Sequence, residues 1–130
     1  MGLPAANAQS TIVATDTHIV MIPSPGGPVP TPLPSPFVGQ LSLQTATTVF
    51  IGGQPAAVVG TQGQNNPVHI PAGGPFQKPP ANLGTVKMGS STVSFGGKAA
   101  ARATDTAETC NDPSDLPVGQ VVATGTVFVG

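Results

Sequence analysis

Glycine and proline interrupt this chain along its whole length and set the strongest limit on its fold. The 130 residues include 17 glycines and 16 prolines. Both residue types destabilise helices, proline far more than glycine, and no stretch longer than about ten residues shows a clean helical period. A helical bundle is therefore excluded. We predict an all-β fold of short strands and tight turns, with room for one short helix near residues 99–106.

Short apolar and β-branched runs separated by glycine-containing turns predict β-hairpins. The turns are Gly52-Gly53, Gly96-Gly97 and Thr124-Gly125. The three predicted hairpins join 48–51 to 57–59, 92–95 to 100–102, and 121–123 to 126–129.

The segment 21–39 is rich in proline. A polyproline linker would need a domain on either side, and residues 1–20 are too few to form one. We therefore interpret 21–39 as an ordered extended loop that packs on a single domain spanning residues 1–130.

Charged residues are scarce, which narrows the classes of function. Four basic and five acidic side chains give a net charge of −1. Four basic residues neutralise too few phosphates for electrostatic binding of nucleic acid, so we expect no nucleic-acid partner. The sequence shows no positively charged signal-peptide region and no run of about 20 apolar residues that would span a bilayer. The single cysteine, Cys110, excludes an internal disulfide.

An internal repeat organises the chain. The string TVFIGGQPAA at 48–57 aligns with TVSFGGKAAA at 92–101. Residues 4–6 give a partial third copy of the Pro-Ala-Ala part, and residues 126–130 repeat the first strand of the hairpin. Three related units of this kind imply a body with pseudo-threefold symmetry.

Each repeat unit leads to one residue that can bind a metal. Pro4-Ala5-Ala6 is followed by His18, Pro55-Ala56-Ala57 by His69 at the same spacing, and the third unit by Cys110 three residues sooner. In a pseudo-threefold body these side chains would converge on one axis, and imidazole nitrogen and thiolate suit zinc. We predict that His18, His69 and Cys110 hold a metal. The alternative is that they are ordinary packed residues.

Two aspartates, Asp16 and Asp105, follow the same Ala-Thr pair and precede a threonine. We interpret both as equivalent turn-capping residues, because aspartate side chains accept hydrogen bonds from nearby backbone N–H groups. Arg102 is the only arginine, and we expect it to pair with Asp105 or Glu108 or to contact a partner.

The hairpin followed by Pro-Ala-Ala resembles the PAAR-repeat family, which is named after the motif Pro-Ala-Ala-Arg. The resemblance covers nearly the whole chain. Its most specific parts are Thr17-His18 with the proline-rich stretch to Phe37, NPVHIP at 66–71, FQKPPAN at 76–82 and TCNDP at 109–113.

The resemblance implies a small conical all-β fold whose broad base caps a homotrimeric VgrG-like β-helical spike, one monomer per trimer. It implies a metal-pinned apex, usually a structural zinc held by three histidines and one cysteine, and no enzymatic activity. Such a tip is assembled in the bacterial cytoplasm and belongs to a type VI secretion system, an extracellular contractile injection system or a phage-like particle. It is delivered outside the cell or into a target cell, with transient contact with the target membrane and possible effector cargo.

The sequence departs from the family pattern at two places. Residues 99–102 read Ala-Ala-Ala-Arg, and Ser35 stands where the remaining histidine of the family is expected. Serine is a poor zinc ligand, so the fourth position is left to water or to Asp112. An open position is typical of catalytic zinc, and the alternative function is therefore a small zinc-dependent hydrolase. The His-Glu-x-x-His pattern of many such enzymes is absent.

Overall fold

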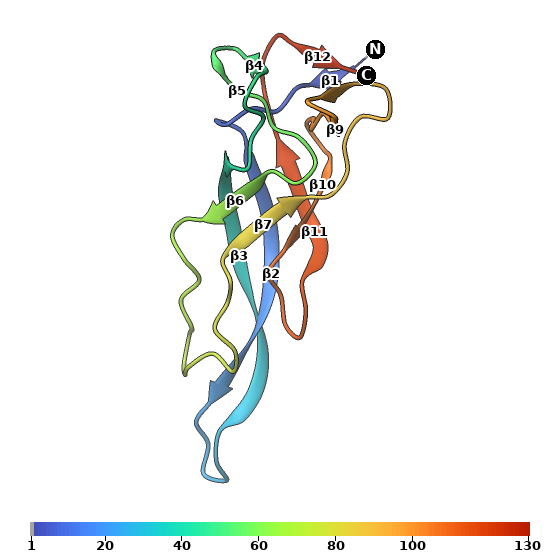
Figure 1. Cartoon of the computed structure of the whole chain (residues 1–130). Coiled ribbons are helices and arrows are strands. Elements are labelled where there is room, and N and C mark those ends of the chain that lie inside the picture. The colour runs from blue at the N-terminus through green and yellow to red at the C-terminus, as the bar shows by residue number, and fades with distance from the viewer. Residues whose placement is uncertain (1) are drawn as a thin grey trace.

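The computed structural model describes residues 2–130, and this part of the chain contains strands and turns but no helix (Figure 1). The predicted all-β class is thereby confirmed, and residues 99–106 form strand ends and a turn rather than a helix. With no helix in residues 2–130, there is also none in this range that could cross a membrane. The strands are β1 (Leu3–Pro4), β2 (Thr11–Ile22), β3 (Val29–Leu43), β4 (Phe50–Ile51), β5 (Gln54–Pro55), β6 (Gln62–Asn65), β7 (Leu83–Val86), β8 (Ser94–Phe95), β9 (Lys98–Ala99), β10 (Thr106–Thr109), β11 (Leu116–Val122) and β12 (Phe128–Val129).

Six strands close into an antiparallel barrel in the order β10-β11-β2-β3-β6-β7. The barrel consists of the hairpins β2–β3, β6–β7 and β10–β11, each of which also pairs with the next. Its interior is filled by one large ring, Phe37, with aliphatic side chains around it. Because the barrel is closed, each of its six strands has a paired neighbour on both sides, and the barrel itself has no free edge strand.

Three two-stranded sheets, which we call the base, lie together at one end of the molecule: β1–β12 and the hairpins β4–β5 and β8–β9 (Figure 1). The predicted turns at Gly52-Gly53 and Gly96-Gly97 are confirmed, and all four glycines have positive φ, as this two-residue turn requires. The predicted second strands at 57–59 and 100–102 are wrong, because β5 and β9 follow the turns directly. The third predicted hairpin is wrong. β12 pairs with β1 and not with residues 121–123, of which 121–122 belong to barrel strand β11. The reason is that β12 repeats the first strand of the hairpin, and the matching second strand lies in the N-terminal copy.

The base repeats the same backbone contacts three times. Ala6 N–H donates to the carbonyl of Ala101, Ala101 N–H to Ala57, and Ala57 N–H to Ala6, each at 3.0 Å. All three alanines are fully buried. Because three backbones meet at hydrogen-bonding distance, a side chain larger than alanine has little room there. The repeated Ala-Ala pair thus has a packing cause, and the cyclic contacts relate the three units by an approximate threefold axis.

The proline-rich segment is ordered but is mostly strand, so the predicted loop is wrong for 21–22, which end β2, and for 29–39, which belong to β3. β3 pairs with β2 from Thr11↔Gln40 to Ile22↔Val29. Prolines occupy every second position of β3 from 30 to 36 and are exposed. Since proline has no N–H, these positions must be the ones whose N–H would point away from β2. The outer edge of β3 therefore offers no donors to another strand, which protects it from edge-to-edge pairing.

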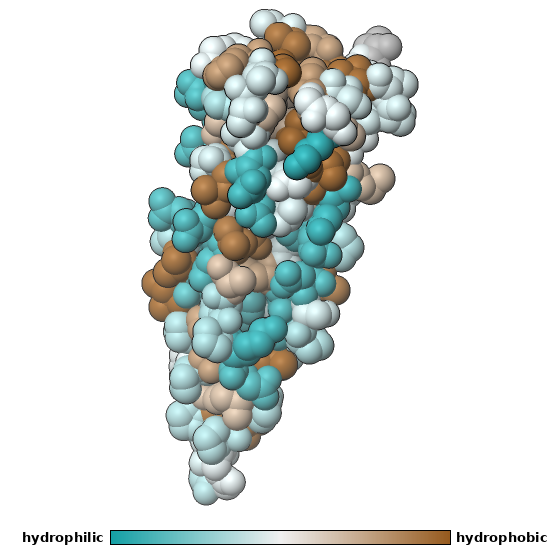
Figure 2. Space-filling view, in the orientation of Figure 1, coloured by the Kyte–Doolittle hydropathy of each residue, from teal (hydrophilic) through white to brown (hydrophobic). Residues whose placement is uncertain are grey.

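Residues 15–36 of the β2–β3 hairpin extend past the barrel, and we call them the arm. Figure 2 shows that the body narrows from the base toward the end of the arm. The loop between β6 and β7 braces the arm: Met21 N–H donates to Pro75 O, and Gln77 N–H donates to Ile19 O, both at 2.8 Å. No charged residue lies between Asp16 and Lys78 in the sequence, so the outer part of the arm is uncharged.

Candidate metal centre

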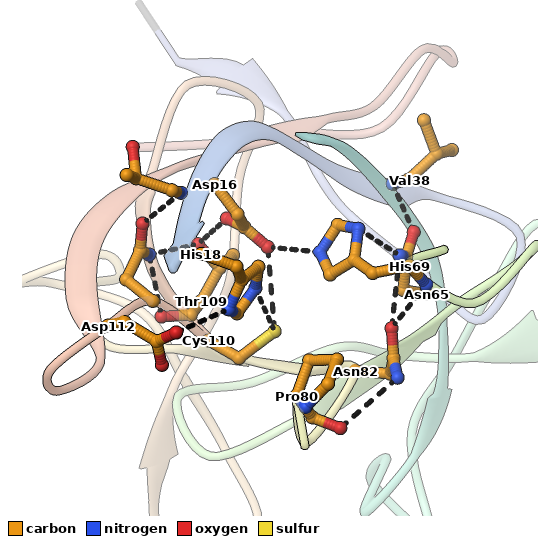
Figure 3. Close-up of polar contacts among 12 residues, drawn as sticks. Asp16, His18, Val38, Asn65, His69, Pro80, Asn82, Thr109, Cys110 and Asp112 are labelled. Atoms are coloured by element: carbon orange, nitrogen blue, oxygen red, sulfur yellow. Dashed lines mark hydrogen bonds and ion pairs between the residues drawn. The ribbon is translucent and has the colours of Figure 1, made fainter. Parts of the chain in front are cut away.

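Four side chains that can bind a metal meet inside the molecule where the arm leaves the barrel (Figure 3). They are Asp16, His18, His69 and Cys110, and their potential ligand atoms all lie within 4.8 Å of one another. All four residues are buried, the most accessible being His69 at 7%. The structure thus brings together the three residues that the repeat pattern indicated, and it adds a carboxylate. Beyond His18, the arm continues for four more residue pairs to its turn, so the cluster lies at the root of the arm.

Asp16 and His18 reach the cluster because they alternate along β2. Ile12, Asp16, His18 and Val20 share the buried face of this strand, as a period of two residues dictates. The Thr109 hydroxyl donates to Asp16 Oδ1 at 2.5 Å, which leaves Oδ2 facing the cluster. The Asp-x-His spacing, which places both side chains on one face of a strand, is the signal that sequence analysis missed.

The interpretation of Asp16 as a turn cap is therefore wrong, whereas that of Asp105 is correct. Asp105 Oδ2 accepts the Arg102 N–H at 2.7 Å, and the Arg102 guanidinium pairs with Asp105 at 2.8 Å, as expected. The structural counterparts of Asp105 are Ser10 and Thr61, whose hydroxyls accept the N–H three residues earlier. The Ala-Thr-Asp-Thr string occurs at both aspartates, but the two residues are not structurally equivalent in their repeat units.

His69 lies in the loop between β6 and β7 and is held by two amides. Its backbone N–H donates to Asn82 Oδ1 at 2.9 Å, and its Nδ1 lies 3.2 Å from Asn65 Nδ2. Asn82 has a positive φ of 57°, a conformation that asparagine tolerates better than most residues. Nε2 of His69 is left facing Asp16 Oδ2 at 2.8 Å.

His18 presents its two nitrogens to different groups. Nε2 lies 3.7 Å from Cys110 Sγ, while Nδ1 lies 3.5 Å from Asp112 Oδ2 on the other side of the ring. Asp112, proposed from sequence as a fourth ligand, therefore sits behind His18 and outside the group of four. Ser35, at the position where the family pattern has a histidine, lies opposite Asp16 in the β2–β3 register.

Burial favours the neutral forms of two of these side chains, His18 and Cys110, in the absence of a cation. It lowers the pKa of His18, and positive charge on His69 lowers it further, while Asp112 and Asp16 oppose the shift. Burial also raises the pKa of the Cys110 thiol to about 11, and the charge of Asp16 adds to this rise. A neutral imidazole is the form that binds a metal, but the thiol must lose its proton to do so.

The donor set suits a divalent ion of the zinc type. Two ligands at about 2.0 and 2.3 Å from a tetrahedral zinc lie about 3.5 Å apart, and Cys110 Sγ is 3.5 Å from Asp16 Oδ2 and 3.7 Å from His18 Nε2. The His69–Asp16 separation is that of a hydrogen bond, so these two groups must part by about half an ångström for all four to bind. One carboxylate and one thiolate balance the charge of a divalent cation.

The chain matches no family model, no curated protein and no solved structure.

Proposed function

We propose that this chain is a PAAR-like structural tip protein, which caps the homotrimeric VgrG-like spike of a contractile injection apparatus and carries a structural zinc. One observation carries the proposal: a base with threefold-related contacts forms the broad end of a tapering body, and a buried metal-ligand cluster lies at the root of the arm that forms its narrow end. A monomer can match a trimer only if it presents a similar surface three times, and the cyclic alanine contacts provide this repetition.

The base also offers apolar groups for such a partner. Phe50 and Phe128 occupy equivalent positions in two of the base hairpins, opposite Pro55 and Pro4, and are 60% and 59% exposed. Ser94 holds the third equivalent position, opposite Ala99. Figure 2 shows apolar residues on the end of the molecule formed by the base. Exposed aromatic side chains of this kind are typical anchors of protein interfaces.

The four candidate ligands favour a structural metal over a catalytic one. Four protein ligands fill a tetrahedral site, whereas a zinc-dependent hydrolase, the alternative function, needs a free position. A cavity of about 60 Å³ borders His18 and Cys110, far below the roughly 300 Å³ of a small substrate pocket. A shallow groove of about 270 Å³ borders His69, the one titratable side chain among its lining residues.

The arm would be the leading point of the particle. Its outer part lacks charged residues, which lowers the cost of transient contact with a target membrane. Assembly in the bacterial cytoplasm, delivery beyond the cell and carriage of effector cargo belong to the same proposal.

A binding experiment with matched variants tests the proposal. Phe50→Ser and Phe128→Ser are combined, because serine is the natural residue at the third equivalent position and suits the hairpin. Val29→Ser, an equally mild change at an exposed site on the arm, is the control. We expect the wild type and the control to bind a recombinant VgrG-type trimer encoded in the same genome, and the double variant to lose binding while keeping its metal. Absence of wild-type binding, or full binding by the double variant, would contradict the proposal.

A further inference from the structure

Asp112 holds β2 on both sides of His18. Its Oδ2 accepts the Ile19 N–H at 2.9 Å, and its own backbone N–H donates to Thr17 O at 2.9 Å. Its neighbour Asn111 accepts the Thr17 N–H at 2.7 Å. The segment after Cys110 therefore replaces a neighbouring strand along β2, beyond the point where β11 stops pairing with it.

The same carboxylate faces the ring of His18 away from the cluster. The Asp112 side chain is 2% exposed, and its Oδ2 lies 3.5 Å from His18 Nδ1 (Figure 3). Within residues 2–130, His18 Nδ1 and Asp112 Oδ1 are the buried side-chain nitrogen or oxygen atoms that lack a hydrogen-bond partner. Buried polar atoms are normally paired, so two such atoms on facing groups require an explanation.

Metal ligation by His18 provides one. A histidine that binds a metal through Nε2 carries its proton on Nδ1, and that N–H is usually donated to a carboxylate, a carbonyl or water. Asp112 is the carboxylate placed to accept it. Lys78 Nζ lies 3.7 Å from the other oxygen, Oδ1, and donates a hydrogen bond to Pro113 O. The loop that carries Asp112 is therefore also held by a contact on its solvent side.

We infer that Asp112 is a positioning residue of the metal centre: it fixes the orientation and tautomer of His18 without binding the metal itself. The segment 110–112 then supplies the thiolate ligand, the clamp on β2 and the acceptor for His18. This inference rests on the proposed metal centre and adds a role that a fourth-ligand assignment for Asp112 would not give.

The test compares Asp112→Asn with Asp115→Asn. Asp115 lies in the same loop, is exposed, and loses the same charge when substituted. Zinc affinity is measured by competition with a chromogenic chelator, the stability of the metal-free proteins by thermal denaturation, and the His18 tautomer by ¹⁵N NMR. We expect Asp112→Asn to bind one zinc with an affinity about 10- to 100-fold weaker, with metal-free stability near that of the wild type, and Asp115→Asn to bind like the wild type.

The outcomes separate this inference from the proposed function. If the wild type binds no zinc, the metal centre itself is wrong. If the wild type binds zinc and Asp112→Asn binds it equally well, Asp112 has no positioning role. A loss of zinc stoichiometry in Asp112→Asn would instead make Asp112 a ligand, and an equal loss of metal-free stability would make it a purely structural residue; either result overturns the inference.

Discussion

Replacing Gly74 with alanine is expected to detach the loop that braces the arm. A Cβ at this position would lie 1.9 Å from the carbonyl oxygen of Met21, so the loop or the strand must move by more than about 1 Å to relieve the overlap. The backbone oxygen cannot rotate away as a flexible side chain could. The nearby hydrogen bonds from Met21 to Pro75 and from Gln77 to Ile19 are the contacts that such a movement would break.

The size of the effect follows from these contacts. Two backbone hydrogen bonds at a net value of about 0.5–1.5 kcal/mol each, together with lost packing of the loop, amount to about 2–3 kcal/mol. An unfolding entropy of about 2.1 cal/mol/K per residue then gives a fall in Tm of about 7–11 °C. Thermal denaturation measures this fall, and hydrogen exchange at the Met21 amide shows whether the loop has separated from β2.

Gly26 provides the matched control, because it lies in the turn of the arm and a Cβ there meets nothing within 4 Å. Gly26→Ala is expected to leave Tm unchanged or slightly raised. If Gly74→Ala keeps the wild-type Tm and the protection of Met21, the bracing role of this loop is refuted.

Three further predictions concern other parts of the molecule. Arg102→Ala removes a partly exposed ion pair with Asp105 and is expected to cost about 1–2 kcal/mol, measured by chemical denaturation; no change would show that this pair is not stabilising. In the metal-free protein, Cys110 has a folded-state pKa of about 11 against an ordinary 9.0, so stability is expected to hold below pH 9 and to fall as the pH rises through 11; denaturation across this range should show a slope that Cys110→Ser lacks. Combined Pro32→Thr and Pro34→Thr restore N–H donors to the outer edge of β3 and are expected to promote concentration-dependent association, seen by light scattering; a strictly monomeric variant would contradict the edge-protection argument.

The sequence was sufficient to predict the fold class and the turns of two base hairpins, because these depend on local signals, but it placed the second strand of each hairpin a few residues too late. Gly52-Gly53 and Gly96-Gly97 determine tight turns through their backbone freedom alone. The third hairpin was mispredicted because β1 and β12 lie at opposite ends of the sequence, and no local pattern in 121–129 shows that the pairing is long-range. The strand character of 29–39 was hidden by its prolines, which are compatible with a strand only when they alternate along an unpaired edge.

At the site, aligning the repeat units identified His18, His69 and Cys110 as candidate ligands but did not identify Asp16. The alignment compares residue identities, and it matched Asp16 with Asp105 because both stand in an Ala-Thr-Asp-Thr string. In the structure Asp105 caps a turn, whereas Asp16 lies six residues beyond the equivalent turn at Ser10. The informative pattern was that Asp16 lies two residues before His18, so that both side chains point to the same face of a strand. This pattern identifies Asp16 as a ligand only once the barrel shows which face of β2 is buried.

Elemental analysis of the purified protein tests the central claim most directly, with Cys110→Ser and His18→Ala prepared alongside. We expect about one zinc per wild-type chain, as a site with four protein ligands should hold. We also expect each variant to lose both zinc and thermal stability, because metal binding joins three distant segments of the chain. A folded and stable wild-type protein that contains no metal, and whose variants are equally stable, would contradict it.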